Sequence, residues 1–199
     1  MVTPVPYAEA AMTQTLVLVF HPDLSRSHAN AALASAAGTV NGVTVIDMTA
    51  TRTDGGVSFP DADAQAAMLM AADRIVLQFP LQWYSTPPLL KAWQDAILTR
   101  MVYLVPEEEG RHLRGKPLML AVTAGNKASA YRPGGANLMP LTDLLAPLWA
   151  TANRCGLVMD APFFLYEADR LTPAEREAAA ADYATALERW ISATTPAGV

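Results

Sequence analysis

The chain has 199 residues, of which 52% are hydrophobic and 17% charged, so it is long and apolar enough to bury the core of one globular domain. Fourteen Lys and Arg against nineteen Asp and Glu give a net charge of −5, which leaves no electrostatic footprint for nucleic acid. One cysteine excludes an intrachain disulfide, and together with three scattered histidines it argues against a structural zinc site.

The first half of the chain alternates short apolar runs with helix-like segments. Residues 15–20 (TLVLVF) predict a strand buried on both faces, because the apolar run is continuous. Residues 27–37 (SHANAALASAA) predict a helix that opens on a serine cap. A β-branched strand is expected over residues 43–47, a helix with an aspartate cap over residues 61–72, and a third strand over residues 74–79 (RIVLQF).

The second half continues the alternation. A helix over residues 88–98 begins at a proline, where the missing N–H costs nothing, and a strand is predicted over residues 117–123 (PLMLAVT). The helix expected over residues 141–154 holds an internal proline that can kink it. The fifth strand, residues 157–166, is also interrupted by a proline, which suits a sheet edge. Residues 172–192 predict a long closing helix with a threonine cap.

This order predicts an α/β fold with a parallel sheet covered by helices on both faces. Five strands fit the flavodoxin-like order 2-1-3-4-5, a three-layer sandwich. We expect a single domain over residues 12–199, because no repeat or linker divides the chain. Residues 1–11 contain two prolines and lack positive charge. This composition indicates a flexible extension and not a signal peptide.

Several further features of the sequence indicate structure or location and not a functional site. No apolar run approaches the roughly 20 residues that cross a bilayer, so the cytoplasm is the expected location. Longer irregular insertions are expected at residues 54–60 and 102–116, and the acidic run at residues 107–109 indicates a solvated face more than a site. Cys155 lies in an apolar helical pattern, which favours a small buried thiol over a nucleophile.

The loops after strands 1, 3 and 4 should open onto one crevice at the carboxyl edge of the sheet. The first loop is HPDLSRSHAN, residues 21–30. Its histidines, arginine and hydroxyl groups precede a helix start, where free N–H groups and a positive dipole end favour phosphate binding. Ser27 could instead only cap its own helix. The sequence has neither a G-x-G-x-x-G fingerprint nor a P-loop.

The other two loops favour a flat ligand. PLQWYSTP, residues 80–87, places a Trp and a Tyr where a plain turn needs only small turn formers. Taken alone, Trp83 could equally be a surface or dimer-contact aromatic. TAGN, residues 123–126, has small side chains that let a ligand approach the backbone amides. A phosphate at one loop and a planar ring at the others describe a flavin nucleotide.

Three motifs also carry a family resemblance: HPDLSRSHAN, QFPLQWYSTPPLLKAWQD and TAGNKASAYRPGG. At these spacings the chain resembles the flavodoxin-like NAD(P)H:quinone oxidoreductases. Within them it looks most like the bacterial ancillary flavoproteins of glutathione-gated potassium efflux. The similarity runs from about Thr15 to Trp190, nearly the whole chain, and the middle motif is the most specific.

The resemblance implies positions for a bound flavin. Its phosphate would lie near His21, Ser27, His28, Ala29 and Asn30. Its ring would lie against Leu81, Gln82, Trp83 and Tyr84, mainly through backbone groups, and its polar edge would face Thr123, Ala124, Gly125 and Asn126. The walls of the acceptor pocket would be Trp83, Tyr84 and Tyr131.

The chain departs from the family pattern at three positions. The larger animal enzymes have a histidine six residues after the pocket tyrosine; here that position is Asn137, which puts a Tyr–His proton relay in doubt. Ala124 and Asn126 replace a Thr and a Gly of the common T-T-G-G motif. Asn126 would clash with, or hydrogen-bond, whatever lies over the ring.

The resemblance implies two-electron transfer from NADH or NADPH, through flavin N5, to a quinone or another electrophile. This chemistry belongs to the cofactor, so no catalytic side chain is assigned. FMN is expected over FAD because the family members that the chain most resembles use FMN. No adenine-binding motif can be recognised in the sequence, and FAD stays open. No basic cluster chooses between NADH and NADPH, although Lys127 or Arg132 could meet a 2′-phosphate. The family also implies a homodimer with the flavin site near its interface.

Two other functions compete with this one. The protein could be a regulatory flavoprotein subunit that docks on a membrane potassium/proton antiporter, with redox turnover secondary or absent; the resemblance supports this, and the acidic insertion could be its docking surface. A one-electron flavodoxin is disfavoured. Flavodoxins hold the phosphate in a hydroxyl- and glycine-rich loop without the histidines seen here, and they are usually much more acidic.

Overall fold

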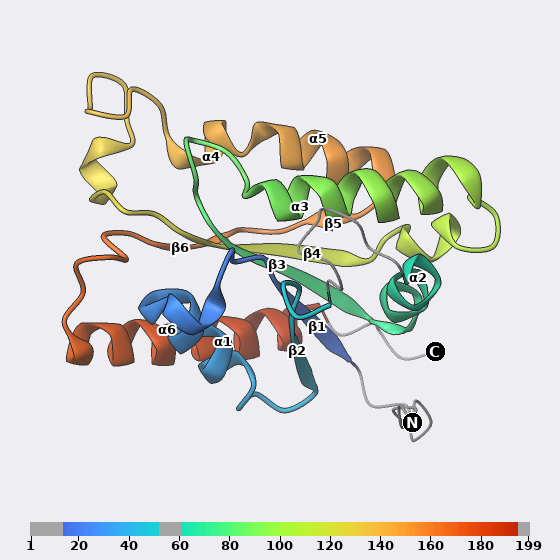
Figure 1. Ribbon diagram of the computed structural model, residues 1–199, viewed down its shortest axis with the longest axis horizontal. Helices are drawn as coiled ribbons and strands as arrows, with labels where there is room; N and C mark the ends of the chain where they lie inside the picture. The colour runs from blue at the N-terminus through green and yellow to red at the C-terminus, as the bar shows by residue number, and fades with distance from the viewer. Residues whose placement is uncertain (1–13, 52–60, 195–199) are drawn as a thin grey trace.

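A twisted parallel sheet runs through the middle of the molecule (Figure 1). The computed structural model describes residues 14–51 and 61–194 and orders the strands β2-β1-β3-β4-β5, with β6 also paired to β4. Every strand pair is parallel. The strands are β1 Thr15–Val19, β2 Val43–Asp47, β3 Arg74–Pro80, β4 Pro117–Thr123, β5 Val158–Met159 and β6 Phe163–Leu165. The predicted flavodoxin-like fold and strand order are confirmed.

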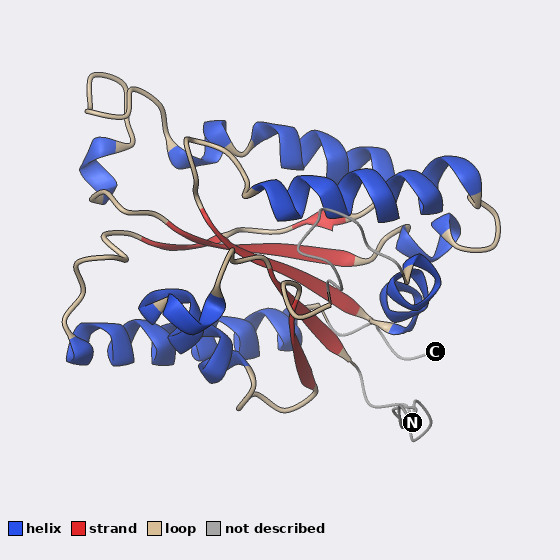
Figure 2. Ribbon diagram, in the orientation of Figure 1, coloured by secondary structure: helices blue, strands red, loops and turns tan. Residues whose placement is uncertain are grey.

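Helices cover both faces of the sheet (Figure 2). One face packs against α1 and α6, and the other against α2, α3 and α5. The helices are α1 His28–Ala37, α2 Ala62–Ala71, α3 Pro88–Trp93, α4 Leu141–Leu144, α5 Ala146–Cys155 and α6 Pro173–Ala193. The predicted caps Ser27, Asp61 and Thr172 each accept a hydrogen bond from the backbone N–H three residues on.

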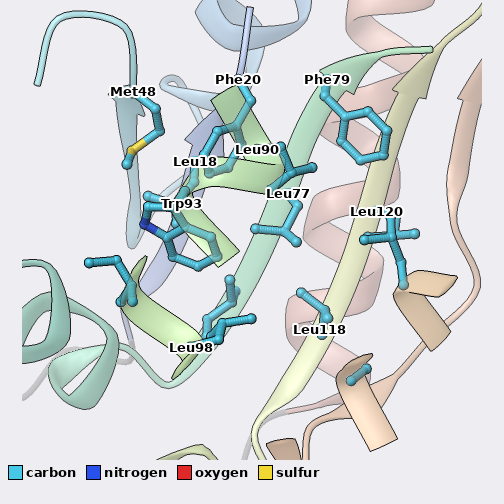
Figure 3. Packing of buried hydrophobic residues seen from close by; sticks show 14 of the residues in the cluster. Leu18, Phe20, Met48, Leu77, Phe79, Leu90, Trp93, Leu98, Leu118 and Leu120 are labelled. Atoms are coloured by element: carbon cyan, nitrogen blue, oxygen red, sulfur yellow. The ribbon is translucent and has the colours of Figure 1, made fainter. Parts of the chain in front are cut away.

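The strands bury side chains on both faces, as their continuous apolar runs predicted. Val17 of β1 faces α1 and α6, whereas Leu16 belongs to the cluster on the other face. Trp93 of α3 lies within that second cluster (Figure 3) and meets Phe20 edge-on, with ring centroids 5.4 Å apart. The sheet therefore holds two cores. The strands β1, β3 and β4 are almost wholly buried, whereas the edge strand β2 is half-buried and exposes Thr44.

The predicted fifth strand, residues 157–166, forms two short strands in place of one. β5 pairs with the start of β4 and β6 with its end. Pro162 lies between them and has no N–H to give to a sheet ladder. Asp160 closes the interruption, because its carboxylate accepts hydrogen bonds from the backbone N–H of Ala161 and from the indole of Trp190 in α6.

The helix that begins at Pro88 is longer than predicted. Two π-helical turns after α3, Gln94–Leu98 and Arg100–Leu104, carry it past its expected end at residue 98. A Cβ on Gly110 would lie 2.3 Å from the carbonyl oxygen of Met101, so only glycine fits where the next short helix packs on this extension. The insertion expected at residues 102–116 is therefore partly helical.

The acidic run at residues 107–109 is not a uniform solvated face. Glu107 and Glu108 are exposed, but Glu109 is buried. Arg100 holds the Glu109 carboxylate from two nitrogens, with a closest N–O distance of 2.6 Å. The prediction is wrong for Glu109, because a charged partner nine residues earlier allows this carboxylate to be buried.

The helix predicted over residues 141–154 breaks in two at Leu145. Pro147 lies in the first turn of α5, where a missing N–H removes no helical hydrogen bond, so the expected kink is a break before the proline. Cys155 at the end of α5 is buried, and burial raises the pKa of its thiol to about 11. The interpretation as a small buried thiol is confirmed.

Two predictions fall outside the described residues: the extension at residues 1–11 and the insertion at residues 54–60. The single domain over residues 12–199 stays a prediction. Within residues 14–51 and 61–194, no helix combines the length and apolar character of a membrane span. In the same ranges, no three His, Cys, Asp or Glu side chains gather as metal ligands would.

Candidate functional site

The loops that follow β1, β3 and β4 meet at the carboxyl edge of the sheet. The N–H of Leu81, just after β3, donates to the carbonyl oxygen of Thr123 at the end of β4 (2.8 Å). The side-chain amide of Asn30, in α1, donates to the Thr123 hydroxyl (2.9 Å). Direct hydrogen bonds thus join the three segments that the sequence places at one edge.

The loop after β1 presents backbone donors at the start of α1. The Ser27 hydroxyl oxygen accepts a hydrogen bond from the N–H of Asn30 (3.1 Å) and so fixes the first turn. The N–H groups of His28 and Ala29 have no acceptor in the part of the chain that the structure describes, as is usual for first helical positions. Ser27 therefore caps its own helix, as the alternative interpretation predicted. The N–H groups of the first two helical residues nevertheless remain free to bind an anion.

His21 lies at the end of β1, where local hydrogen bonds orient its ring. Its Nδ1 accepts from the N–H of Asp23 (3.1 Å), so a neutral ring carries its proton on Nε2, which remains a donor. The carbonyl oxygen of His21 accepts from the Thr49 hydroxyl. A hydrogen bond from Ser25 lowers the pKa of Asp23, so that carboxylate is charged at neutral pH.

The loop after β3 is a two-residue turn with a strained backbone. Gln82 and Ser85 exchange backbone hydrogen bonds of 2.9 and 3.0 Å, and the central residues Trp83 and Tyr84 have φ values of 46° and 63°. Turns with positive φ at both central positions favour Asn-Gly, because a side chain there costs about 1–3 kcal/mol. This turn projects Trp83, which is 94% exposed, and Tyr84 beyond the sheet.

The loop after β4 remains close to the end of β6. Backbone hydrogen bonds fasten it to the segment that follows β6. Thr123 and Ala124 are buried, Gly125 is exposed and Asn126 is half-buried. The Asn126 side-chain oxygen accepts a hydrogen bond from the N–H of Lys127 (3.0 Å). The side chain that replaces the glycine of the family motif is therefore held against the neighbouring backbone.

Three tyrosines from different loops, Tyr84, Tyr131 and Tyr166, form what we term the tyrosine cluster. The rings of Tyr131 and Tyr166 lie 5.7 Å apart at a 44° tilt. Burial raises the pKa of both hydroxyls, and the Tyr84 hydroxyl acts on that of Tyr131 in the same direction. Tyr131 and Tyr166 are therefore protonated at neutral pH.

Two residues of this region were not among the site residues that the sequence predicted. Asn137, at the family's histidine position, accepts a long hydrogen bond from the Tyr84 hydroxyl (3.5 Å) and so links the aromatic turn to the loop after β4. Tyr166 was not predicted as a site residue at all. The signal was available, since Tyr166 directly follows β6, and parallel strands end at the same edge.

Strained backbone concentrates at the carboxyl edge. Within the described ranges, the non-glycine residues with positive φ are Trp83, Tyr84, Leu138 and Glu167, and all four lie in loops that follow β3, β4 and β6. Such strain persists only where the surrounding structure holds it, and it clusters at ligand-binding sites. The strain marks the same edge as the hydrogen bonds between the loops.

Several hollows lie away from this edge, and the largest of these, of about 590 Å³, lies between α1 and α6. Two others are smaller. One, of about 420 Å³, lies between α2 and the strands β1 and β2 and is lined mainly by apolar side chains. The other, of about 350 Å³, lies between the extended α3 helix and α5. Neither is lined by a residue that the sequence predicted for the site.

Comparison with known proteins agrees with this geometry. Residues 13–191 match a family described as "Flavodoxin-like fold". The chain belongs to this flavodoxin-like family. One relative is the glutathione-regulated potassium-efflux system ancillary protein KefG of Cronobacter sakazakii, 37% identical over 191 residues, which are 94% of this chain and 99% of the relative.

Two solved structures extend the comparison. An NADPH-quinone reductase from P. pentosaceus is 27% identical, with a TM-score of 0.71 over 93% of this chain and 99% of that one. General stress protein 14 from Treponema denticola, in complex with FMN, is 31% identical, with a TM-score of 0.76 over 92% of this chain and 99% of that one. The resemblance to the flavodoxin-like NAD(P)H:quinone oxidoreductases and the efflux ancillary proteins is thus confirmed.

The backbone donors of this flavodoxin-like chain fit a flavin nucleotide. The free N–H groups of His28 and Ala29 suit phosphate oxygens. The N–H groups of Trp83, Tyr84 and Gly125 also lack an acceptor among the described residues, and they suit the carbonyl oxygens and nitrogens of a flavin ring. Anion donors on one loop and ring donors on the two beside it match the two ends of FMN.

Proposed function

We propose that this protein is an NAD(P)H:quinone oxidoreductase that holds FMN at the carboxyl edge of its sheet. The observation that carries the proposal is the hydrogen-bonded union of three loops that leave backbone donors free around an aromatic turn. FMN needs donors for its phosphate and donors for the polar edge of its ring, and the free N–H groups of these loops support both assignments. A relative in complex with FMN supports FMN over FAD.

The phosphate would be held at the start of α1. The proposed contacts there are His21, Ser27, His28, Ala29 and Asn30. The first four can offer N–H or hydroxyl donors. Asn30 acts from beneath, because its side chain is buried and its N–H already binds Ser27.

The ring would lie between the loops after β3 and β4. The proposed contacts are Leu81, Gln82, Trp83 and Tyr84 on one side and Thr123, Ala124, Gly125 and Asn126 on the other. Thr123 and Ala124 are buried, so they shape the floor, whereas Gly125 is exposed and lets the ring approach its N–H.

When bound, FMN supplies two-electron hydride chemistry between NAD(P)H and a quinone. The chain contributes orientation and charge stabilisation: backbone N–H groups beside the ring favour negative charge on its polar edge. Trp83, Tyr84 and Tyr131 form the walls of the acceptor pocket. The Tyr131 hydroxyl stays protonated because burial raises its pKa, and it can give its proton to the oxygen of a reduced quinone and regain one from water.

The finer assignments follow from exposed side chains at the same edge. Lys127 and Arg132 are exposed cations after β4 and would meet the 2′-phosphate if NADPH is the donor. Trp83, Leu138 and Met139 are exposed apolar side chains on two loops at this edge. We propose that a second copy of the chain covers them in a homodimer.

The test is the identity and reactivity of the bound flavin. Purified protein should be yellow, heating should release FMN identifiable by its absorption spectrum and mass, and NADH or NADPH should bleach the protein without oxygen. Added benzoquinone should restore the colour. A colourless protein that binds neither FMN nor FAD and oxidises neither nucleotide would contradict the proposal.

Regulation of a potassium/proton antiporter is the second candidate function. The specific observation in its favour is the similarity to KefG along nearly the full length of both chains. Glu107 and Glu108 are the exposed carboxylates of the insertion and the proposed docking charges. A pull-down with the cytosolic domain of such an antiporter, together with quinone-reduction kinetics, separates the two functions: capture with little turnover supports regulation, and turnover without capture supports the reductase.

A further inference from the structure

Three buried polar side chains form a continuous chain beneath the loops of the carboxyl edge. Gln78 of β3, Asn30 of α1 and Thr123 of β4 are 0%, 2% and 3% exposed. Gln78 Nε2 donates to the carbonyl oxygen of Asn30 (2.9 Å), and Asn30 Nδ2 donates to the Thr123 hydroxyl oxygen (2.9 Å). We term these three residues the buried polar chain.

The buried polar chain connects the first turn of α1 to both other loops. Asn30 is the third residue of α1, and its N–H is capped by Ser27. The carbonyl that Gln78 holds therefore belongs to the same turn that exposes the two free N–H groups of α1. At the other end, the backbone carbonyl of Thr123 accepts from the N–H of Leu81, which leads into the aromatic turn.

Packing alone does not account for a polar residue at position 78. The Gln78 Oε1 and the Asn30 Oδ1 are buried and have no donor within the described part of the chain. Leaving such a group unsatisfied costs about 1–3 kcal/mol. Val76 and Leu77 precede Gln78 in the strand and are buried apolar residues, so an apolar side chain at this position would suit the sheet. What an amide at this position adds, and an apolar side chain would not, is the hydrogen bond to the Asn30 carbonyl oxygen.

We propose that Gln78 is a positioning residue for the phosphate end of the flavin site. By holding the Asn30 carbonyl, it keeps the first turn of α1 in register with the loops after β3 and β4. The inference rests on the proposed function. It adds that a residue without ligand contact supports the binding of the phosphate separately from the binding of the ring. Gln78 touches no ligand; it acts through Asn30, and its loss lowers what the phosphate contributes to binding more than what the ring contributes.

The experiment compares FMN with riboflavin, which has the same ring and no phosphate. Dissociation constants are measured on flavin-free protein by the quenching of flavin fluorescence. The ratio of the riboflavin Kd to the FMN Kd then isolates the phosphate contribution. In Gln78→Met we expect this ratio to fall by about tenfold, which corresponds to about 1.4 kcal/mol, while the riboflavin Kd stays within about twofold.

Thr15→Val is the matched control. Thr15 is also a buried strand residue whose side-chain oxygen has no partner among the described residues, but it lies at the amino edge. Its loss should leave the ratio unchanged. If Gln78→Met does not fold, as judged by circular dichroism, Thr123→Val cuts the other end of the buried polar chain and should lower the ratio in the same direction.

The outcomes separate this inference from the proposed function. An unchanged ratio in Gln78→Met overturns the inference, and so does an equal loss of affinity for both flavins, because equal loss indicates damaged packing. A wild-type protein that binds neither FMN nor riboflavin overturns the proposed function instead. A lower ratio in Gln78→Met with an unchanged ratio in Thr15→Val supports the inference.

Discussion

The carboxyl edge of the sheet leaves backbone donors free, whereas the amino edge uses polar side chains to close the ends of helices and strands. At the amino edge, Lys116 Nζ donates to the carbonyl oxygens of Leu69 and Met70 at the end of α2. There the Asp73 carboxylate also accepts from the N–H of Gln14 (2.6 Å). At the amino edge of the sheet, side chains thus satisfy the backbone groups at the ends of helices and strands. At the carboxyl edge, backbone N–H groups remain free.

Buried polar atoms without partners do not by themselves distinguish the two edges. At the amino edge, the Arg74 guanidinium is buried and donates from Nε to Thr194 (2.7 Å), but its two terminal nitrogens have no partner among the described residues. At the carboxyl edge, Asn30 and Gln78 also keep unpaired atoms. What sets the carboxyl edge apart is the combination of free backbone donors with positive φ at bulky residues.

The largest expected effect comes from deleting one free donor at the carboxyl edge. Proline is tolerated at the first helical position, and Ser27 already has the extended backbone that precedes proline (φ −91°, ψ 115°), so His28→Pro should keep the fold. If this N–H binds the phosphate, the FMN Kd should rise by about 10- to 100-fold, because a charge-assisted hydrogen bond is worth about 1.5–3 kcal/mol. Fluorescence titration measures it.

His28→Ala is the control for that change, since it removes the imidazole and keeps the N–H. It should bind FMN nearly as well as the wild type. Equal losses of FMN affinity in the proline and alanine variants would assign the phosphate contact to the imidazole. They would contradict the prediction that the backbone N–H of this residue binds the phosphate.

A smaller effect should follow from relaxing the aromatic turn. Tyr84→Gly and Tyr84→Ala both remove the ring, but only glycine adopts a φ of 63° without strain. We expect the glycine variant to have the higher free energy of unfolding, by about 1 kcal/mol. Both should raise the KM for a quinone by about the same factor, on the order of tenfold, through loss of a pocket wall. Urea denaturation and steady-state kinetics measure the two effects. Equal stabilities would show that the turn is unstrained.

The smallest effect, and one confined to stability, is expected at the amino edge. Burial lowers the pKa of Lys116 from 10.5 to about 8. Between these values the unfolded chain binds more protons than the folded one, so the free energy of unfolding should rise as the pH goes from about 8 toward 10.5. Because part of the side chain is exposed, we expect a gain of only about 1 kcal/mol.

Lys116→Met should remove that pH-dependent rise, as measured by urea denaturation at pH 7.5 and pH 9.5, and leave the FMN Kd unchanged. A rise that persists in the variant would belong to another group. A clear loss of FMN affinity would break the division between a structural edge and a binding edge.

Features that depend on local chemistry could be predicted from the sequence. Ser27 and Thr172 cap their helices because their hydroxyls reach a backbone N–H three residues on. Pro162 interrupts the last strand because it cannot donate to a ladder. The order of the strands followed from the alternation of elements. Together these were enough to bring the right three loops to one edge.

Features that depend on contacts between distant residues could not be predicted. In the sequence, Gln78 lies near the end of an apolar run and has no polar neighbour that would mark it. Its hydrogen-bond partner, Asn30, lies 48 residues earlier in the chain, so the contact could not be foreseen. The burial of Glu109 depends on the helix extension that carries Arg100. The positive φ values of Trp83 and Tyr84 break the residue preference of such turns, so no turn rule could find them.

The covering of one face by α1 and α6 has a consequence for synthesis on the ribosome. The helices that cover the other face, α2, α3 and α5, have all been made once the chain reaches Cys155. The opposite face, including Val17 and Met119, must wait for α6, whose residues are translated last among the described helices. Until α6 has been made, a nascent chain therefore covers this side of its sheet with α1 alone, and that side is where chaperones or premature self-association would act.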